Sequence, residues 1–528
     1  MKTVRILLLA GCCATLGCDS NNASNRDGGG GNPDLSGGGG DGGGGNGDLA
    51  TAPMIGDSVL QHHRNQTRDG LYVQPAITKA AAAGLHPLAG FSATISGPTY
   101  AQALFVDGLG AGPDMLIVAT EQNHLYALDP ITGAVVWEKQ LDPPLPLSTI
   151  HTNVGGGCGN ISPVGITGTP VIDLPSRTMY FNLHTPDATN ISKHLIYAVS
   201  IDDGSPRAGW PVDVAAKVPG FTSILQQQRP AVALVGGRVY VGYGGHIGDC
   251  GNYHGWVVSV NASDPTDVTA WSSRPIATGV WGPGGPSSDG TSIFITTGNT
   301  TDTPPATWQD TEAIIKLGAG ATFSQADTDF FTPSDWMNLD ITDTDLGGSG
   351  AIVFDVPGAT PSKLVFAFGK DGKVYAADRT NLGGVGGQVA EVLATSNELI
   401  QAAAAYTTPT GSYLVMKGNG TGCPTGSGNL TAVSVTPSPL SMAVAWCNDQ
   451  GGDGSPMVTT TDGTNDAIVW ALGSEGDNRL HGFDADSGAV IFDGGTATFS
   501  QSRRFNTPIA AKGKIYWAAD GAVYAFTP

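Results

Sequence analysis

Cationic side chains are scarce in this chain, which makes the position of each one informative. The sequence has 25 Lys and Arg against 46 Asp and Glu, and a formal net charge of −21. Arg229, Lys370 and Arg504 each stand in a turn-rich segment between predicted strands. Guanidinium and ammonium groups bind carboxylates through charge-assisted hydrogen bonds, so these three would form a site for an anionic ligand if the fold brings them together. The alternative is that each one bridges neighbouring units of the fold.

A histidine-containing loop offers a different chemistry. His246, Asp249 and His254 lie close together in the sequence. Imidazole and carboxylate groups together suit a transition metal. The alternative is a loop that a disulfide at Cys250 fixes in place, with its histidines bonded to the backbone.

A third group consists of carboxylates alone. Asp340, Asp343 and Asp345 have a spacing that suits Ca²⁺, which prefers oxygen ligands, although no Glu follows at the place that a helix-loop-helix calcium site requires. A solvated acidic loop explains the same residues. The sequence has neither a Gly-x-Ser-x-Gly nucleophile turn in a suitable context nor a phosphate-binding Gly-x-x-x-x-Gly-Lys-Ser/Thr run. Four further charged residues stand at the start of predicted inner strands or in the loops before them: Asp371, Glu475, Asp477 and Arg503.

The elements that must position these residues belong to a repeat. In its best copy, from Tyr126 to Trp137, alternating apolar residues predict a half-buried strand, and an Asp and a Gly predict a turn. A second strand then ends in a Trp whose large surface can pack between units. No helical pattern separates the copies, so the repeat predicts a β-propeller. Weaker copies lie at residues 195–200, 373–378, 480–488 and 522–526.

The spacing of the copies gives eight units of four strands. This predicts an all-β, eight-bladed propeller, with seven blades as the alternative if two weak copies belong to one unit. The last unit ends at Pro528 with three strands, and residues 90–96 are predicted to supply the fourth and close the ring. In such a ring the charged residues described above converge on the mouth of the central channel. The residues that occupy the same position in the eight repeat units are Tyr126, Tyr197, Val258, Ile315, Tyr375, Val433, His481 and Tyr524.

The front of the chain has the features of an export signal. Positive charges precede an apolar run and small residues, which predicts a signal peptide at residues 1–17 and a lipid-modified Cys18, with Cys12 as the alternative. An ordinary secreted protein without the lipid is the other possibility. Residues 18–53 are rich in glycine and predict a flexible tether, so the propeller is expected to occupy residues 54–528.

Cysteine content and charge narrow the class further. Four cysteines fall in the predicted propeller, and an even number in an exported protein favours disulfides, with three possible connectivities. Cys423 and Cys447 belong to one blade, so we expect them to pair, which leaves Cys158 with Cys250. Thiolate metal binding is the alternative, but no Cys-x-x-Cys spacing exists. The strong negative charge excludes a nucleic-acid binding protein. We also expect the protein to be a monomer.

The Tyr-Ala-Leu-Asp-x-x-Thr-Gly-x-x-x-Trp pattern resembles the repeat of the pyrroloquinoline-quinone (PQQ) dehydrogenase-like propellers. The similarity covers about residues 62–528 and points to a branch found in exported bacterial proteins. That superfamily contains quinoprotein alcohol dehydrogenases and non-catalytic members, among them outer-membrane assembly lipoproteins. The further segments that carry the resemblance are 98–104, 158–173, 246–256 and 370–375.

The resemblance implies what a catalytic member would need. Such dehydrogenases hold PQQ and Ca²⁺ in the central channel, where a Trp and, in many of them, a disulfide between adjacent cysteines cover the ring and an Asp acts as base. The only adjacent cysteines here are Cys12 and Cys13, inside the signal peptide, and no Cys-x-x-Cys-His haem site is present. If a quinone does bind, then Arg229, Lys370 and Arg504 are the expected partners of its carboxylates.

Two functions therefore remain open. The first is a lipid-anchored protein of the cell envelope, on the periplasmic side or the cell surface, whose propeller binds an envelope protein or a saccharide without catalysis. The second is a PQQ- and Ca²⁺-dependent dehydrogenase that oxidises an alcohol or a sugar. An open channel with a Trp over the cofactor favours the enzyme, whereas a filled channel favours the binding module.

Overall fold

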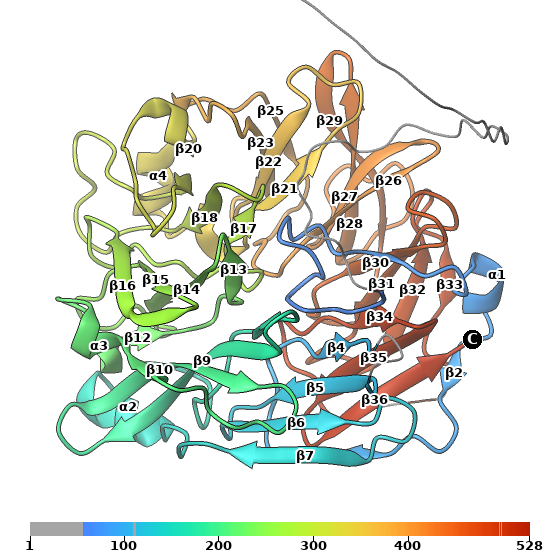
Figure 1. Ribbon diagram of the computed structural model, residues 1–528. Helices are drawn as coiled ribbons and strands as arrows, with labels where there is room; N and C mark the ends of the chain where they lie inside the picture. The colour runs from blue at the N-terminus through green and yellow to red at the C-terminus, as the bar shows by residue number, and fades with distance from the viewer. Residues whose placement is uncertain (1–55, 109–111, 496, 498) are drawn as a thin grey trace, which may run out of the picture. The chain divides into compact units, whose positions relative to one another are not determined.

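The computed structural model describes residues 56–108, 112–495, 497 and 499–528. The predicted signal peptide, Cys12, Cys18 and the whole of the predicted tether lie outside these residues. The described chain forms eight mainly antiparallel sheets of four or five strands, which are the blades of the predicted eight-bladed propeller (Figure 1). The seven-blade alternative is wrong. Among the described residues, no helix combines the length and the apolar character that crossing a membrane requires.

The first four blades follow the order of the chain, each beginning with its innermost strand. Blade 1 contains β4 (Leu104–Val106), β5 (Met115–Ala119), β6 (His124–Leu128) and β7 (Val135–Gln140). Blade 2 contains β8 (Val171–Asp173), β9 (Thr178–Asp187), β10 (Ile191–Ser200) and β11 (Val212–Asp213). Blade 3 contains β13 (Ala233–Val235), β14 (Arg238–Gly245), β15 (Trp256–Asn261) and β16 (Asp264–Ser272), with β12 (Gln226–Gln227) beside β14. Blade 4 contains β17 (Ser287–Ser288), β18 (Ile293–Thr297), β19 (Ala313–Leu317) and β20 (Phe330–Thr332), with β24 (Gly384–Val385) parallel to β20.

The second half repeats this plan. Blade 5 contains β21 (Ile352–Asp355), β22 (Lys363–Phe368), β23 (Lys373–Asp378) and β25 (Ala390–Leu393). Blade 6 contains β26 (Ala404–Thr408), β27 (Gly411–Lys417), β28 (Leu430–Pro437) and β29 (Leu440–Asn448). Blade 7 contains β30 (Met457–Thr460), β31 (Ile468–Leu472), β32 (Leu480–Asp484) and β33 (Val490–Phe492). Blade 8 contains β34 (Ile509–Ala511), β35 (Lys514–Ala519) and β36 (Ala522–Thr527).

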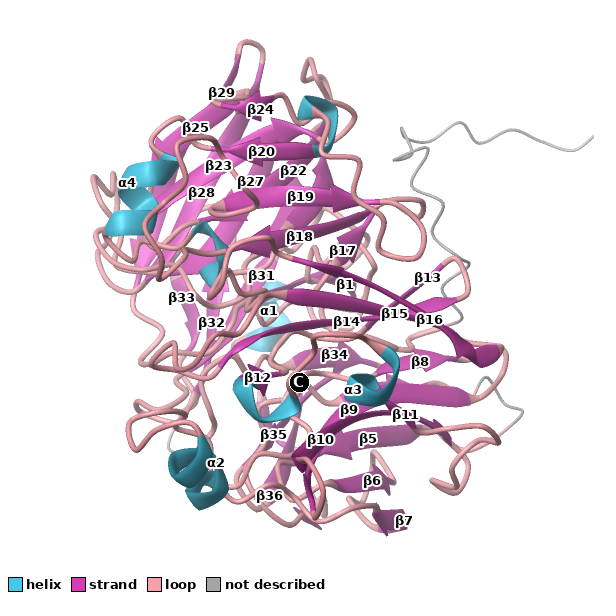
Figure 2. Cartoon of the chain, turned by 90° about the vertical axis from the view of Figure 1, so that its left-hand side faces the viewer, coloured by secondary structure: helices cyan, strands magenta, loops and turns pink. Residues whose placement is uncertain are grey.

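Helices are short and lie among the loops, whereas the strands make up the blades (Figure 2). Thr78 caps the first helix by accepting a hydrogen bond from the backbone N–H of Ala81. The α-helices within the described residues are α1 (Lys79–Ala82), α2 (Leu147–Asn153), α3 (Val214–Lys217) and α4 (Trp336–Ile341).

The two ends of the described chain close the ring, as predicted. Strands β2 (His86–Pro87) and β3 (Ala93–Thr94) both pair antiparallel with β36, the last strand of the chain. Ala93 lies opposite Val523, within the segment that the sequence assigned to this role. The pairing covers an edge of blade 8 that three strands alone would leave open.

Neighbouring blades are joined by apolar cores and by aromatic side chains. The indole of Trp137 in blade 1 donates a hydrogen bond to the carbonyl of Ile201 in blade 2, at 2.9 Å. Trp446 in blade 6 does the same to Ala485 in blade 7, also at 2.9 Å. Both indoles are nearly inaccessible to solvent. The Trp of the repeat therefore packs between units. Its indole N–H also donates to a backbone carbonyl that directly follows the third strand of the next blade.

Residues 57–77 form a second structure, which we call the channel plug. This segment lies against the innermost strands, and its trace crosses the middle of the ring in Figure 1. Its strand β1 (Leu71–Val73) pairs parallel with β30. Backbone hydrogen bonds from the plug reach the blades in chain order: Val59 with Phe105 of blade 1, Leu60 with Ile172 of blade 2, Gln66 with Ser288 of blade 4, Thr67 with Val353 of blade 5, Asp69 with Ala405 of blade 6, and Gly70 with Val458 of blade 7.

Side chains of the plug reach the two remaining blades. The buried guanidinium of Arg68 donates to the carbonyl of Val232 at the start of blade 3, at 3.1 Å. The amide oxygen of Gln74 accepts from the N–H of Gly513 in blade 8, at 2.7 Å. The plug therefore bonds to all eight blades, and the centre of the ring is filled by the chain's own N-terminal segment.

Candidate functional site

Two of the three predicted cations meet in one pocket at the channel mouth. This mouth pocket has a volume of about 560 Å³, and Lys370, Arg504 and Lys417 all line it. Its other charged residues are Glu398 and Asp453. The loops that precede the innermost strands, together with the loops between second and third strands, place these side chains on the same face of the propeller.

Each cation of the mouth pocket also forms an ion pair. Lys370 contacts Asp345 and lies 3.3 Å from Asp343. Burial opposes the charge of Lys370, but the two carboxylates outweigh it and raise the pKa of the ammonium group. The ion pair with Asp345 therefore joins the loop before the third strand of blade 5 to the loop that leads from blade 4 to blade 5. Lys370 therefore bridges two blades and also lines the pocket.

Arg504 and Lys417 are held in the same way. The guanidinium of Arg504 lies 2.6 Å from the carboxylate of Glu475 in blade 7. The ammonium group of Lys417 in blade 6 lies 2.7 Å from Asp453. Hydrogen bonding to Glu475 raises the pKa of Arg504 against the effect of burial. The pocket therefore presents fixed positive and negative groups in alternation.

Arg229, the third predicted cation, lines a much smaller axial pocket of about 10 Å³. The plug residue His62, together with Tyr100 and Phe505, lines the same pocket. Phe505 directly follows Arg504, so consecutive residues line the two pockets. The prediction placed Arg229 in one site with Lys370 and Arg504. In the structure, Arg229 lines a separate pocket.

The histidine loop does not gather its side chains around one point. His246 is buried and bonds Gln227 Oε1 at 3.0 Å and the carbonyl of Ile224 at 3.1 Å. Burial lowers its pKa to about 4 despite the hydrogen bond to Ile224, so the ring is neutral at pH 7. Asp249 accepts from the hydroxyl of Tyr253 at 2.6 Å, while His254 bonds the carbonyl of Ser273 at 3.0 Å.

The acidic loop is also bonded to protein donors. Asp340 accepts from the N–H of Thr300 at 3.1 Å and from the hydroxyl of Thr311 at 2.9 Å. Burial raises the pKa of Asp340 to about 6. Asp345 accepts from the N–H of Asn299 at 2.8 Å in addition to its ion pair with Lys370. Throughout the part of the chain that the structure describes, no three His, Cys, Asp or Glu side chains are grouped so as to hold a metal ion.

The remaining charged candidates stabilise turns within their own blades. Asp371 accepts from the hydroxyl of Tyr375 and from the N–H of Lys373. Asp477 lies 2.9 Å from the ring of His481. Arg503 pairs with Asp520 of blade 8.

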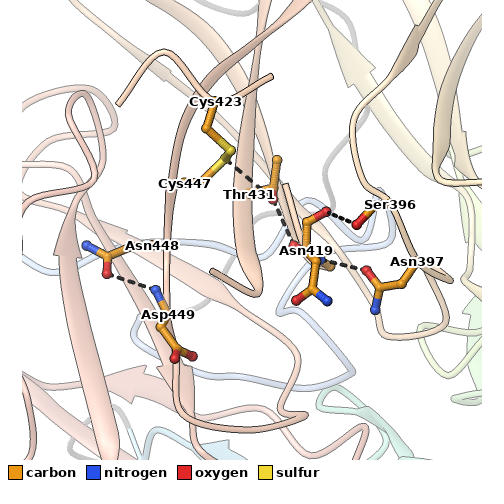
Figure 3. Close-up of a disulfide and its surroundings, with 9 residues drawn as sticks. Ser396, Asn397, Asn419, Cys423, Thr431, Cys447, Asn448 and Asp449 are labelled. Atoms are coloured by element: carbon orange, nitrogen blue, oxygen red, sulfur yellow. Dashed lines mark hydrogen bonds between the residues drawn. A yellow bond between two sulfur atoms is a disulfide. The ribbon is translucent and has the colours of Figure 1, made fainter. Parts of the chain in front are cut away.

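Both predicted disulfides are confirmed. Cys158 pairs with Cys250 and thereby fixes the histidine loop, and Cys423 pairs with Cys447 within blade 6. Figure 3 shows the second bridge beside the wall of the mouth pocket. The N–H of Ser396 donates to the carbonyl of Asn419, which lies in the loop that leads to Cys423, at 2.8 Å. The disulfide therefore limits the movement of a loop that holds pocket residues in place.

Four features of the site were not found from the sequence. His62, Tyr100 and Phe505 were not predicted as site residues, and the plug itself was assigned to the propeller without a role of its own. A signal did exist: residues 61–69 hold nine polar or charged residues in succession within a chain of low charge, without the alternation of a strand. Such a run must either face solvent or bond internally, and here it bonds internally.

Known proteins resemble this chain in fold rather than in sequence. No protein-family model matches the chain, and no curated protein matches it by sequence. Among solved structures, the quinohemoprotein alcohol dehydrogenase from Comamonas testosteroni matches at 13% identity over 89% of this chain and 80% of that chain, with a TM-score of 0.60. The fold is that of a PQQ-like β-propeller.

Two further structures agree. Quinohemoprotein alcohol dehydrogenase ADHIIG from Pseudomonas putida HK5 matches at 12% identity over 89% of this chain and 80% of that chain, with a TM-score of 0.62. A europium-containing methanol dehydrogenase matches at 13% identity over 90% of this chain and 99% of that chain, with a TM-score of 0.61. At these identities the likeness establishes the fold, and function has to be argued from the site.

Proposed function

We propose that this protein is a non-catalytic binding module of the bacterial cell envelope, held by a lipid at Cys18, and that its mouth pocket binds a saccharide. The observation that carries the proposal is the channel plug. A ring whose centre is filled by its own N-terminal segment keeps only its loop face for a ligand.

The channel does not fit PQQ, the cofactor that the fold family implies. The plug bonds to the inner strands of the blades, and the axial pocket above it has a volume of about 10 Å³. A cavity of this size holds roughly one water molecule, whereas PQQ is a three-ring system with three carboxylates. The mouth pocket is large enough, but the residues that line it include no aromatic ring to cover a planar cofactor.

The chemistry of the mouth pocket suits a sugar. Its volume of about 560 Å³ lies within the range of small-molecule sites. Fixed cations, carboxylates and side-chain amides supply donors and acceptors side by side, which matches a ligand covered with hydroxyl groups. Ile400 is the single aliphatic residue in its lining, so the pocket lacks the apolar anchors of a protein interface. The amides are those of Asn397 and Gln401.

A panel of immobilised saccharides tests the proposal. The full chain in detergent should bind at least one member, and Lys417→Met should weaken that binding by about tenfold because it removes a charged donor from the pocket. Lys316→Met is the matched control, because Lys316 is also partly buried and pairs with one carboxylate, that of Asp329. If no saccharide of the panel binds, the proposal that the mouth pocket binds a saccharide is wrong.

The dehydrogenase alternative has its own test. We expect that titration of the full chain with PQQ in the presence of Ca²⁺ leaves tryptophan fluorescence without a saturable change. Tight, saturable quenching would show that the channel opens to admit the cofactor, and a dye-linked substrate screen would then be required.

Attachment to the membrane is tested by metabolic labelling with a fatty acid. Label in the wild type and in Cys12→Ala, but none in Cys18→Ala, is the expected result. Label that disappears only in Cys12→Ala would move the lipid to the alternative cysteine. A wild type without label would make this an ordinary secreted protein.

A further inference from the structure

The axial pocket contains a buried histidine without a hydrogen-bond partner. His62 is 2% exposed, and neither of its ring nitrogens has a partner within the described chain. Burial, followed by the neighbouring His63 and Arg68, lowers the pKa of His62 well below its usual value. The ring is therefore neutral at pH 7 and carries one N–H donor and one acceptor. Since buried polar groups are nearly always bonded, this ring offers a donor and an acceptor to a polar atom that enters the pocket.

The second wall of the pocket is a guanidinium group on which the carboxylates of Asp345 and Asp249 act only from a distance. Arg229 donates through Nε to the carbonyl of Trp281 at 2.8 Å, and its guanidinium lies 4.9 Å from the centre of the Phe505 ring. No carboxylate of the described residues forms an ion pair with Arg229, in contrast to Lys370, Lys417 and Arg504. Burial lowers the pKa of Arg229 to about 10, which leaves the group charged at pH 7.

Three hydroxyl groups also line the pocket. The hydroxyl of Thr167 donates to the carboxyl group of Glu121 at 3.2 Å and is therefore already used. The hydroxyl oxygen of Thr169 accepts from the N–H of Gln102 at 2.9 Å, so its hydrogen is free to donate. The phenol of Tyr100 has no hydrogen-bond partner within the described chain, and burial raises its pKa to about 12, so it remains a donor. The pocket thus gathers a guanidinium, an imidazole and two hydroxyls with a hydrogen to donate, and no carboxylate is among its lining residues.

We propose that the axial pocket binds the carboxylate of an acidic sugar, whose ring lies in the neighbouring mouth pocket. A terminal guanidinium nitrogen of Arg229 can donate to a carboxylate oxygen. A space of about 10 Å³ holds roughly one water molecule, so one carboxylate oxygen takes this place and the rest of the carboxyl group lies toward the mouth pocket. Because Arg504 lines the mouth pocket and the adjacent Phe505 lines the axial pocket, we place the sugar ring in the mouth pocket. This inference rests on the proposed function and names the class of saccharide.

Calorimetric titration of the full chain in detergent tests this with D-glucuronate, and D-glucose is the neutral control. Glucuronate should bind at least about tenfold more tightly than glucose, because charge-assisted hydrogen bonds contribute that much or more. Arg229→Gln should reduce glucuronate affinity to that of glucose. Arg177→Gln, which alters a surface pair with Asp202, should leave it unchanged.

Tyr100→Phe provides an independent variant, because it removes a single unpaired hydroxyl and keeps the ring. It should weaken glucuronate binding and leave glucose binding as it is, and sodium acetate should compete with glucuronate. Equal affinity for the two sugars, or glucuronate binding that survives Arg229→Gln, would overturn the carboxylate site and leave saccharide binding in place. Binding of an acetylated tri-alanine with a free C-terminal carboxylate, without binding of either sugar, would overturn both proposals in favour of a peptide.

Discussion

Two buried glutamates have the same role at equivalent places in the ring. Glu121 accepts from the N–H of Gly165 at 2.6 Å, and thereby ties blade 1 to the loop that enters blade 2. Glu312 accepts from the N–H of Leu346 at 2.5 Å, and ties blade 4 to the loop that enters blade 5. In each carboxyl group the other oxygen is buried and has no partner within the described chain. A single proton on that oxygen would remove the cost of a buried charge.

The proton on Glu121 makes stability depend on pH. Burial raises its pKa from the ordinary value of 4.5 to about 7, against the hydrogen bonds from Gly165 and Thr167. The folded state therefore holds a proton that the unfolded state releases between these two values, so this group lowers stability as pH rises through that range. Glu121→Gln should add about 3 kcal/mol more to the free energy of unfolding at pH 8 than at pH 5.

Urea unfolding of both proteins at the two pH values measures this difference. Glu391→Gln, which changes an exposed carboxylate, is the control and should shift the free energy equally at both. An equal effect of Glu121→Gln at pH 5 and pH 8 would mean that Glu121 is ionised throughout.

At the scale of elements, the plug depends on one arginine. The guanidinium of Arg68 is 1% exposed, and none of the described carboxylates forms an ion pair with it; it donates to the carbonyls of His62, Val232 and Pro286. These three bonds join the plug to itself, to blade 3 and to the loop before blade 4.

Gly70 contributes to the plug through its backbone conformation. Its φ is 69°, and a Cβ at this position would lie 3.0 Å from the Cβ of Ala404, so another residue would strain the backbone and force its neighbour to shift.

Arg68→Met should lower the free energy of unfolding by about 3 kcal/mol or more, because three buried carbonyls lose their donor. Arg207→Met is the matched control: Arg207 also donates to carbonyls, those of Ser176 and Arg177, but it is half-buried and water can replace it. We expect about 1 kcal/mol or less for Arg207. Equal losses in denaturant titration would show that the plug contributes little to the fold.

The sequence predicted the blades well because each one repeats a local pattern. Alternation, the Asp-Gly turn and the terminal Trp are properties of neighbouring residues, and so is the pairing of 90–96 with the last strand once the final unit is seen to lack one. The plug was missed because its partners lie in eight different strands, from Phe105 to Gly513, and no local pattern encodes such contacts.

The site was predicted in part for the same reason. The repeat places Lys370 in a loop between the second and third strands and Arg504 in a loop before an innermost strand. Both kinds of loop lie on the same face, so the meeting of these residues in one pocket follows from the ring. His62 and Phe505 could not be placed without the path of the plug and the left-handed turn at Phe505, whose φ is 74°. The paired cysteines were assigned from blade membership, which is again a consequence of the repeat.

At the scale of the whole molecule, two disulfides restrain the ring over different lengths of chain. Cys158–Cys250 spans 92 residues and joins the loop before blade 2 to blade 3, whereas Cys423–Cys447 spans 24 residues within blade 6. In the chain-entropy description, a longer loop gives a larger stabilisation. The first bridge should therefore contribute more to stability than the second.

Replacement of each cysteine pair by serine tests this order. Loss of Cys158–Cys250 should lower the free energy of unfolding by about 4–5 kcal/mol, and loss of Cys423–Cys447 by about 3–4 kcal/mol. Denaturant titration of the two variants against the wild type gives both values. The reverse order would show that the bridges act through native contacts, such as those of the mouth-pocket wall, rather than through loop length.

Native-state hydrogen exchange, followed by mass spectrometry on the full chain, tests most directly whether the channel is filled. The amides of Ile172, Ser288, Val353, Ala405 and Val458 donate to carbonyls of the plug. The account predicts that peptides covering residues 57–77 and these inner-strand amides exchange as slowly as the central strands of the blades. Exchange of residues 57–77 within seconds, beside protected blades, would show an open channel and would favour the PQQ-dependent dehydrogenase instead.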